Sequence, residues 1–438
     1  MDSENEDEAL RPKIHPLNLF DLAQSQNRLL YTSAPMVRYS KLAFRRTVHH
    51  FGTDLCWTPM ILAKEFNRNQ VARDSDLTMS TAPIPAYDSA STPPLSVLAG
   101  GGKGEVPTIA QFGANDPTEL SRAASLAAPF VNGVDLNCGC PQSWACASTL
   151  GAALMNHREL VRDMVTATRE RLTRNGWDVT CPPNSNSNSN SNPNPDSDTQ
   201  TTRGRSISVK IRVHKDLRQT MDFITTVLGT DPNRRNIDFL TIHPRTRNTP
   251  SSTPINLEAL EILTSTFGKK VPILVSGDVF ALSTLPYTSH LLDPQPTFTT
   301  SSPPNPTVDS NPGSKLSLDE IQKKLHLPNV AGLMSARALL ANPALYAGHD
   351  SCPWTAVDVF MNEVSRAPLP LKLGVHHLTE MCGPGFGPGR DRGVALLSKR
   401  ERARLTELGS WIDVIDLMDE VRSRNEGGEK GRGIVRFA

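Results

Sequence analysis

The segment Asn137-Cys138-Gly139-Cys140-Pro141 follows an apolar run and contains residue types that could carry out acid–base chemistry. A free thiol has a pKa of about 8.5, so most of Cys140 is protonated at neutral pH. It could act as a general acid or, once deprotonated, as a nucleophile. Asn137, three residues earlier, could orient a substrate or a cofactor. A single cysteine is more often a small buried hydrophobe, so this hypothesis depends on the residues that would accompany Cys140.

Polar residues in or after other apolar runs could form one site with Cys140. Lys210 would place a cation where a reduced flavin becomes negative. His243 could donate a hydrogen bond to a flavin or substrate carbonyl. Gln111 carries both a donor and an acceptor, which suits the edge of a flavin ring. Pro35 and Met36 offer an apolar shelf for a flat ring.

A phosphate could bind beside this ring. Backbone N–H groups at Gly277 and Ala336, next to expected helix starts, could contact it, and Arg337 would add a positive charge. Each of these residues alone is more often structural. Only the set as a whole indicates a site.

Eight short apolar runs would position the candidate residues, and helix-like stretches separate most of them. This alternation indicates a parallel sheet, and eight units indicate an α/β fold of the (β/α)8 TIM barrel type, with chemistry at the C-terminal strand ends. The predicted strands are Leu29–Ala34, Asp54–Thr58, Thr108–Phe112, Val134–Asn137, Ser208–Arg212, Phe239–His243, Ile273–Ser276 and Gly332–Ser335. The predicted helices are Ser40–Phe51, Ala63–Asn67, Thr118–Ala127, Arg158–Asn175, Leu217–Leu228 and Leu257–Phe267.

The pattern changes after Tyr346, where three helices are predicted: Val357–Val364, Leu371–Glu380 and Glu401–Val421. We therefore divide the chain into an N-terminal tail (1–27), a barrel (28–350) and a small helical domain (351–438). The helical domain contains a basic cluster, which is either a solvated helix face or a phosphate-binding face. This cluster comprises Arg390, Arg392, Lys399, Arg400, Arg402 and Arg404.

Two segments are predicted to be inserts within the barrel. Residues 182–205 contain an Asn-Ser repeat, and residues 286–317 are rich in Pro, Ser and Thr. Neither segment can bury enough apolar surface to offset the entropy lost on ordering, so we expect both to be disordered.

Composition limits the classes of partner. The formal net charge is +1, from 46 basic and 45 acidic residues, which argues against a wholesale polyanion binder but allows a local basic face. The start of the chain is acidic and polar, and no apolar run reaches the roughly 18 residues of a membrane span. The seven cysteines are expected to be reduced thiols of a cytoplasmic or nuclear, non-secreted protein. We also expect a monomer. Cys138, Cys140 and Cys146 lack zinc-site spacing, so no metal is expected.

Taken together, the quoted segments resemble the tRNA-dihydrouridine synthase family. The most specific match is Asp135-Leu-Asn-Cys-Gly-Cys-Pro141 with Gln142-Ser-Trp-Ala145, which is similar to the family's active-site loop. Further matches in order and spacing extend the resemblance over about Leu29 to Gly348. Two details, Gln142-Ser-Trp and Leu339-Leu-Ala-Asn-Pro343, resemble the eukaryotic branch that modifies tRNA positions 20a and 20b. The further matches are Gln111–Asn115, Val209–Arg212, Ile242–Arg245 and Leu333–Pro343.

This resemblance implies an FMN-dependent enzyme, driven by NADPH or NADH, that reduces uridine to 5,6-dihydrouridine in the D-loop of tRNA. It implies that Cys140 is the proton donor, and that Asn137 and Arg245 contact the substrate. The implied FMN contacts are Pro35, Met36, Val37, Gln111, Lys210, His243, Ser276, Gly277, Asp278, Ala336 and Arg337. Three positions depart from many relatives: Pro244 and Ala336 replace Gly, and Ser276 replaces Asn.

Three other functions stay open at this stage. A flavin barrel related to dihydroorotate dehydrogenase would act on a free pyrimidine. An aldolase would form a Schiff base on Lys210, and its purified protein would be colourless. A tRNA-binding protein without catalysis would leave D-loop uridines unmodified.

Overall fold

The computed structural model describes residues 14–71, 73, 106–177, 204–231, 234–282, 285, 327, 329–387 and 395–426. The predicted insert 286–317 lies outside these residues, as does 182–203 of the other insert. Arg205, which we assigned to the first insert, instead belongs to the barrel. Its side chain is buried and its Nε donates to the carbonyl of Ala128 at 2.6 Å. The barrel strand begins at the next residue, so the predicted end of the insert was too late.

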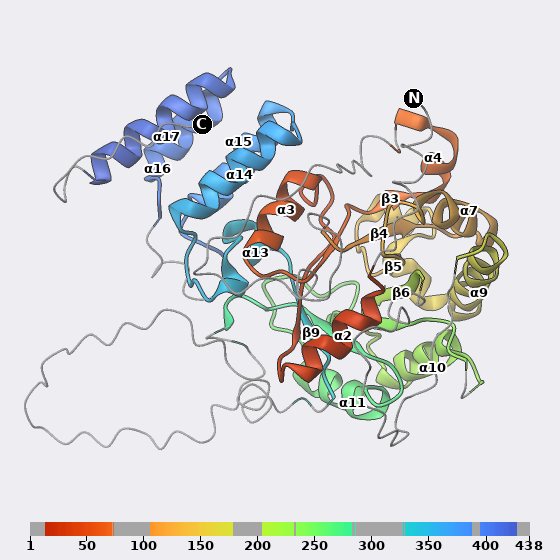
Figure 1. Cartoon of the computed structure of the whole chain (residues 1–438). Helices are drawn as coiled ribbons and strands as arrows, with labels where there is room; N and C mark the ends of the chain where they lie inside the picture. Colours follow the sequence, from red (N-terminus) through yellow and green to blue (C-terminus); the bar gives the residue numbers. More distant parts are fainter. Residues whose placement is uncertain are drawn as a thin grey trace, which may run out of the picture.

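The strands form one closed, parallel barrel (Figure 1). The order is β2-β1-β9-β8-β7-β6-β5-β4-β3, and a further pairing of β2 with β4 closes it. Consecutive β2 and β3 both pair with β4 and share one barrel position. The predicted (β/α)8 fold and its eight strand positions are confirmed. The strands are β1 (Leu30–Ser33), β2 (Leu55–Trp57), β3 (Ile61–Leu62), β4 (Thr108–Gly113), β5 (Gly133–Cys138), β6 (Ser206–Ile211), β7 (Phe239–Ile242), β8 (Ile273–Ser276) and β9 (Gly332–Ser335).

Side chains alternate between the two faces of each strand, which places polar groups inside the barrel. On β5, Val134 and Leu136 pack in the large apolar cluster, whereas Asp135 and Asn137 belong to the alternate set. On β6, the register places Lys210 directly beside Asn137. The interior near the C-terminal strand ends is therefore polar. The largest apolar cluster lies between strands and helices, and a second one fills the barrel toward its N-terminal end.

Helices surround the strands (Figure 1). Several start at a side-chain cap: Asp116 accepts from the N–H of Glu119, and Asn256 accepts from that of Ala259. Such caps fix where each helix begins and so define the loops that follow the strands. The helices are α3 (Leu42–His50), α4 (Ala63–Arg68), α7 (Pro117–Ala127), α8 (Ser143–Ala147), η1 (Gly151–Asn156), α9 (Arg158–Arg174), α10 (Leu217–Leu228), α11 (Leu257–Phe267), α13 (Arg337–Ala341) and η5 (Leu345–Ala347).

The N-terminal end of the barrel is covered by α2 (Pro16–Ser25), which lies within the segment that we assigned to the tail. Leu19 and Phe20 are buried in one cluster with strand residues, and the rings of Phe20 and Phe239 are 5.4 Å apart. The tail assignment therefore does not hold for residues 16–25, because this helix buries apolar side chains against the barrel.

The C-terminal helices form a group on one side of the barrel, next to α3 (Figure 1). They share an apolar cluster with α3, and a buried ion pair of 3.3 Å joins Arg46 of α3 to Glu363 of α14. The predicted helix Glu401–Val421 is wrong as a single element. The chain breaks at Gly409, and Ser410 accepts a hydrogen bond from the N–H of Asp413. The observed helices are α14 (Trp354–Arg366), α15 (Leu371–Met381), α16 (Lys399–Glu407) and α17 (Trp411–Glu426).

Candidate active site

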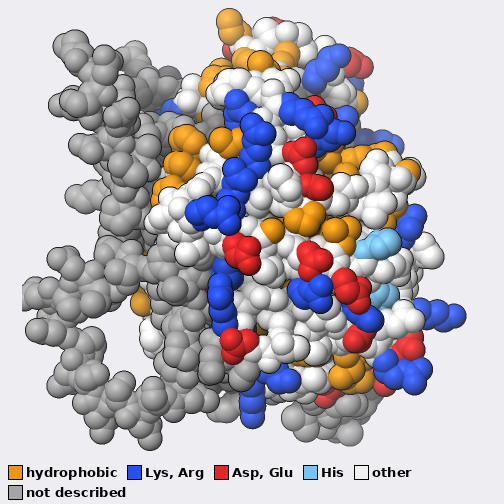
Figure 2. Space-filling view, turned by 90° about the vertical axis from the view of Figure 1, so that its right-hand side faces the viewer, with side chains coloured by type: hydrophobic (Ala, Val, Ile, Leu, Met, Phe, Trp, Pro, Cys, Tyr) orange, Lys and Arg blue, Asp and Glu red, His pale blue; other side chains and the backbone are white. Residues whose placement is uncertain are grey.

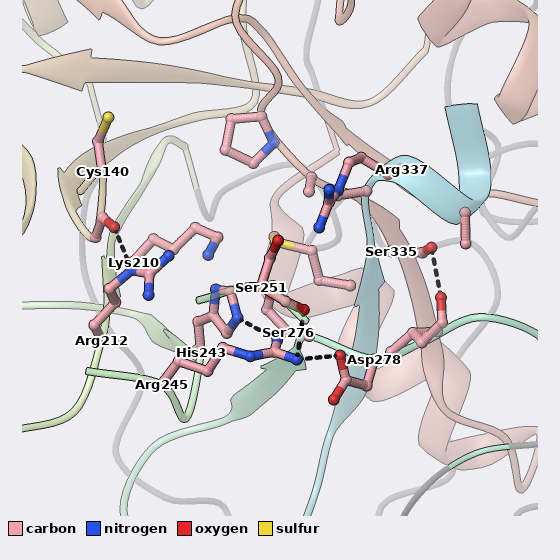
Figure 3. Close-up of a pocket in the computed structure, with 18 of the residues that line it drawn as sticks. Cys140, Lys210, Arg212, His243, Arg245, Ser251, Ser276, Asp278, Ser335 and Arg337 are labelled. Atoms are coloured by element: carbon pink, nitrogen blue, oxygen red, sulfur yellow. Dashed lines mark hydrogen bonds and ion pairs between the residues drawn. The ribbon is translucent and has the colours of Figure 1, made fainter. Parts of the chain in front are cut away.

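A cavity of about 660 Å³ opens where the strands end at their C-terminal side. Its size falls within the range of small-molecule sites. Figure 3 shows the side chains of Lys210, His243 and Arg337, from three different strand ends, pointing into the same space. Met36, in contrast, is buried in the core and does not line the cavity. The predicted site residues that line it are Pro35, Val37, Gln111, Asn137, Cys140, Lys210, His243, Arg245, Ser276, Gly277, Asp278, Ala336 and Arg337.

Residues 139–142 connect β5 to α8 and are called the Cys140 loop. Its backbone is held from two sides. The Oδ1 atom of Asn137 accepts from the N–H groups of Gly139 at 3.0 Å and of Cys140 at 2.8 Å. The carbonyl of Cys140 accepts from the N–H of Ala152 at 2.8 Å. Gly151 has a φ of +60°, and a Cβ atom there would lie 2.5 Å from the Cys140 carbonyl oxygen. A close contact that only glycine permits therefore supports this loop.

The Cys140 thiol lies at the edge of the cavity, half-buried. Burial raises the pKa of the thiol, so it stays protonated at neutral pH. Figure 3 shows its sulfur pointing away from Lys210 and His243. The loop thus brings Cys140 to the cavity that these residues share, but the thiol itself does not face them.

Gln111 is held at both ends of its amide. Its Nε2 donates to Asp135 at 2.7 Å, and its Oε1 accepts from the Nδ2 of Asn137 at 2.7 Å. Gln111 is fully buried, and Asn137 is nearly so. Among the described residues, one N–H of each amide has no further partner and is available to a bound molecule.

Lys210 supplies a cation that forms no ion pair with any residue that the structure describes. Burial lowers its pKa to about 8, with Arg212 as a further cause, while Asp135 opposes the shift. Its ammonium donates no hydrogen bond within the described part of the chain. At neutral pH, Lys210 is therefore mostly charged and free to bind an anion or a carbonyl.

His243 is neutral, and its contact with Arg245 fixes which ring nitrogen carries the proton. Burial, aided by Lys210 and Arg212, lowers the pKa of His243 well below its usual value, so the ring is neutral. A guanidinium can only donate, so its 3.0 Å contact makes the Nε2 of His243 the acceptor. The ring proton is then on Nδ1, which has no partner among the described residues. His243 can therefore donate to a molecule in the cavity.

Asp278 lines the cavity and also holds the side chain of Arg245 in place. Its carboxylate pairs with the guanidinium at 2.6 Å and accepts from the N–H of Ile255 at 2.9 Å. Arg245 also donates to the carbonyls of Ser251 and Thr253. Most donors of Arg245 are thus used within the protein.

Arg212 and Phe386 also line the cavity but were absent from the predicted set. The Nε of Arg212 donates to the carbonyl of Gly139 at 2.7 Å, which ties β6 to the Cys140 loop. Phe386 follows α15, and the centroid of its ring lies 4.3 Å from the guanidinium carbon of Arg337. The position of Arg212, two residues after Lys210, could have revealed it. No sequence signal connects Phe386 to the barrel.

The outer surface differs from the cavity in its charge balance. Figure 2 shows Lys and Arg side chains on one face with Asp and Glu side chains between them. On the helices of this side, Arg162 pairs with Asp163 at 2.7 Å, and Arg158 pairs with Asp222. Much of the surface charge is therefore compensated. Within the described residues, no group of three potential metal ligands is found, and no helix is long and apolar enough to cross a membrane.

The basic cluster of the helical region is also partly compensated. Arg404 pairs with Glu420 at 2.8 Å, and Arg402 donates to the carbonyl of Leu397 at 2.6 Å. Arg390 and Arg392 lie outside the described residues. Lys399 and Arg400 are exposed and form no ion pair with a described residue. They are thus the described members of the cluster best able to bind phosphates.

Comparison with known proteins assigns this fold and site to a class. Residues 32–181 match the model of the family described as dihydrouridine synthase (Dus). The chain is 30% identical to the NAD(P)+ tRNA-dihydrouridine(20a/20b) synthase of Schizosaccharomyces pombe, over 92% of this chain and 91% of that protein. It is 31% identical to the corresponding synthase-like protein of Homo sapiens, over 93% and 94%. A Saccharomyces cerevisiae synthase of the same name is 27% identical, over 96% and 87%. The chain belongs to the dihydrouridine synthase family.

Proposed function

We propose that this protein is an NAD(P)H-driven flavoenzyme that reduces uridine to 5,6-dihydrouridine in the D-loop of tRNA, at positions 20a and 20b. The names of its relatives support this reaction, these positions and the nicotinamide reductant. The structural observation that carries the proposal is the convergence of Lys210, His243 and Arg337 on one cavity with Cys140 at its edge.

The donors around the cavity fit FMN. Lys210 and Arg337 are cations without a carboxylate partner among the described residues, and the Nδ1–H of His243 is unused. These groups suit the ring carbonyls and the phosphate of a flavin nucleotide. Helix α13 has only five residues, so Arg337 and the backbone at Gly277 are the groups expected to hold the phosphate. When bound, FMN would supply the hydride for the uracil ring after reduction by NADPH or NADH.

Residues of the chain would bind the uridine and deliver a proton. The unused N–H of Asn137 is available to orient the base, and Cys140 would transfer its proton to C5 of uracil. For this transfer the sulfur must turn toward the cavity, which requires a change in the χ1 rotamer of Cys140. The uridine must leave its stack to enter, at a cost of a few kcal/mol that is smallest in a loop.

The helical region would provide part of the tRNA contact. Its exposed Lys399 and Arg400 follow the 383–387 segment, whose Phe386 reaches the cavity. Phosphate contacts there would hold the tRNA while the target base enters the barrel. The region from 351 onward is therefore proposed to act as the tRNA-contacting domain.

The proposal is tested with the purified protein and unmodified tRNA. A flavin absorption spectrum, loss of NADPH or NADH absorbance, and dihydrouridine at 20a and 20b by mass mapping are expected together. Protein without bound flavin that also fails to bind added FMN would contradict the cofactor assignment. Turnover of free uracil or orotate without turnover of tRNA would identify an enzyme of free pyrimidines instead.

A further inference from the structure

A continuous series of hydrogen bonds connects the buried carboxylate of Asp135 to the backbone at Cys140. Asp135 accepts from Gln111, Gln111 accepts from Asn137, and Asn137 accepts from the N–H groups of Gly139 and Cys140. All four distances lie between 2.7 and 3.0 Å. We call Asp135, Gln111 and Asn137 the amide relay.

Burial raises the pKa of Asp135 to about 6, so the carboxylate is mostly ionised at neutral pH. The relay then has a defined direction because an ionised carboxylate only accepts hydrogen bonds. Gln111 must therefore present its nitrogen to Asp135 and its oxygen to Asn137. Asn137 must in turn present its nitrogen to Gln111, which leaves its oxygen for the two N–H groups of the loop. With both amides reversed, the nitrogen of Asn137 would oppose two N–H donors.

We propose that Asp135 is a positioning residue that sets the direction of this relay and thereby fixes the backbone of the Cys140 loop. The inference deepens the proposed function, since it concerns the placement of the proposed proton donor. Asp135 does not line the cavity, so its effect would be exerted through Gln111 and Asn137. It is only 1% exposed, and Ser208 donates to its other oxygen at 2.7 Å.

Charge alone is the competing explanation, because Asp135 also interacts electrostatically with Lys210. The substitution Asp135→Asn distinguishes the effect of charge from the effect of the hydrogen-bond acceptor. It removes the charge but keeps an oxygen that can accept from Gln111, provided that its NH₂ group faces Ser208. The hydroxyl of Ser208 can rotate to accept that N–H. Asp135→Leu keeps the number and branching of side-chain heavy atoms and removes both the charge and the acceptor.

The experiment is site-resolved hydrogen exchange of the amides of Gly139 and Cys140 in the purified full chain. Asp135→Leu should accelerate exchange at both sites about tenfold or more. Without the relay, the hydrogen bonds from these two N–H groups to the Oδ1 of Asn137 are weaker. Asp135→Asn and the matched control Ser208→Ala should stay within about twofold of wild type. Equal acceleration in Asp135→Leu and Asp135→Asn would assign the effect to charge and overturn the proposal.

A second variant guards against general loss of folding in Asp135→Leu. Gln111→Met has similar length, leaves the Asp135–Ser208 contact intact and interrupts the relay at its centre. It should accelerate the same two amides while β8 and β9 keep wild-type protection. Unchanged exchange at Gly139 and Cys140 in this variant would refute the relay. Because exchange is measured without turnover, failure of the proposed reaction would appear separately, as an inactive wild-type protein with a protected loop.

Discussion

Replacing Gly151 with alanine should displace Cys140 and slow the reaction far more than it weakens the fold. The added Cβ would lie 2.8 Å from the Cβ of Cys140 and 2.5 Å from its carbonyl oxygen. Ordinary carbon–carbon contacts are about 3.5–4.0 Å, so the loop must shift by roughly 1 Å. A misplacement of that size can reduce a rate by about 100-fold.

The same substitution also carries a backbone cost, because Gly151 has a φ of +60°. An alanine in this region is disfavoured by roughly 1–2 kcal/mol. Gly176→Ala is the matched control: Gly176 has a φ of +84°, and nothing lies within 4 Å of the added Cβ. Both variants should lose similar stability in urea unfolding, but only Gly151→Ala should lose activity.

The assay is a single-turnover measurement in which enzyme with reduced flavin is mixed with unmodified tRNA and dihydrouridine is quantified over time. Flavin fluorescence titration checks that both variants still bind FMN. A rate for Gly151→Ala within twofold of wild type would show that the contact does not position Cys140. An equal loss in Gly176→Ala would show that backbone strain, rather than displacement of the loop, lowers the rate.

Four further predictions concern the cavity and the helical region. Cys140→Ala should keep FMN and tRNA binding but lose most turnover, and full activity would remove the thiol from the mechanism. Folding lowers the pKa of Lys210 to about 8, so FMN affinity should fall as the pH rises above this value and the ammonium loses its proton. Lys210→Arg should remove that dependence in fluorescence titrations. Phe386→Ala should weaken FMN binding roughly threefold to tenfold by removing a cation–π contact worth about 1 kcal/mol, whereas Phe386→Trp should retain it. Neutralising Lys399 and Arg400 should weaken tRNA binding and flatten its dependence on salt, and an unchanged slope in filter binding would place the contacts elsewhere.

Strand positions could be predicted because each barrel strand is a short apolar run with a polar residue near its end. Parallel strands buried on both faces require such runs, and barrel closure then brings Gln111, Lys210 and His243 together. The packing of α2 could not be predicted, because this helix is short. It is stabilised only by its contacts with the end of a barrel that has already formed. The break at Gly409 was missed because a helical pattern continues on both sides of it.

Within the site, sequence reasoning predicted most of the residues that meet but not how each one is bonded. The roles of Asp135 and Arg212 depend on neighbours across the sheet, and the direction of the Cys140 sulfur depends on a rotamer. Phe386 is separated from Arg337 by the whole of α14 and α15. Its contact arises from the way in which the helical region docks, which local patterns do not encode.

Because the helical region docks in this way, a ligand in the cavity would contact both the barrel and the helical region. Phe386 and Gly387 supply part of the cavity wall, and Gly387 packs so closely on Phe280 that a Cβ atom would lie 2.4 Å from that ring. Binding in the cavity and attachment of the helical region are therefore thermodynamically linked, and each must strengthen the other by the same factor. Occupancy of the barrel cavity would thus help to hold the helical region in place.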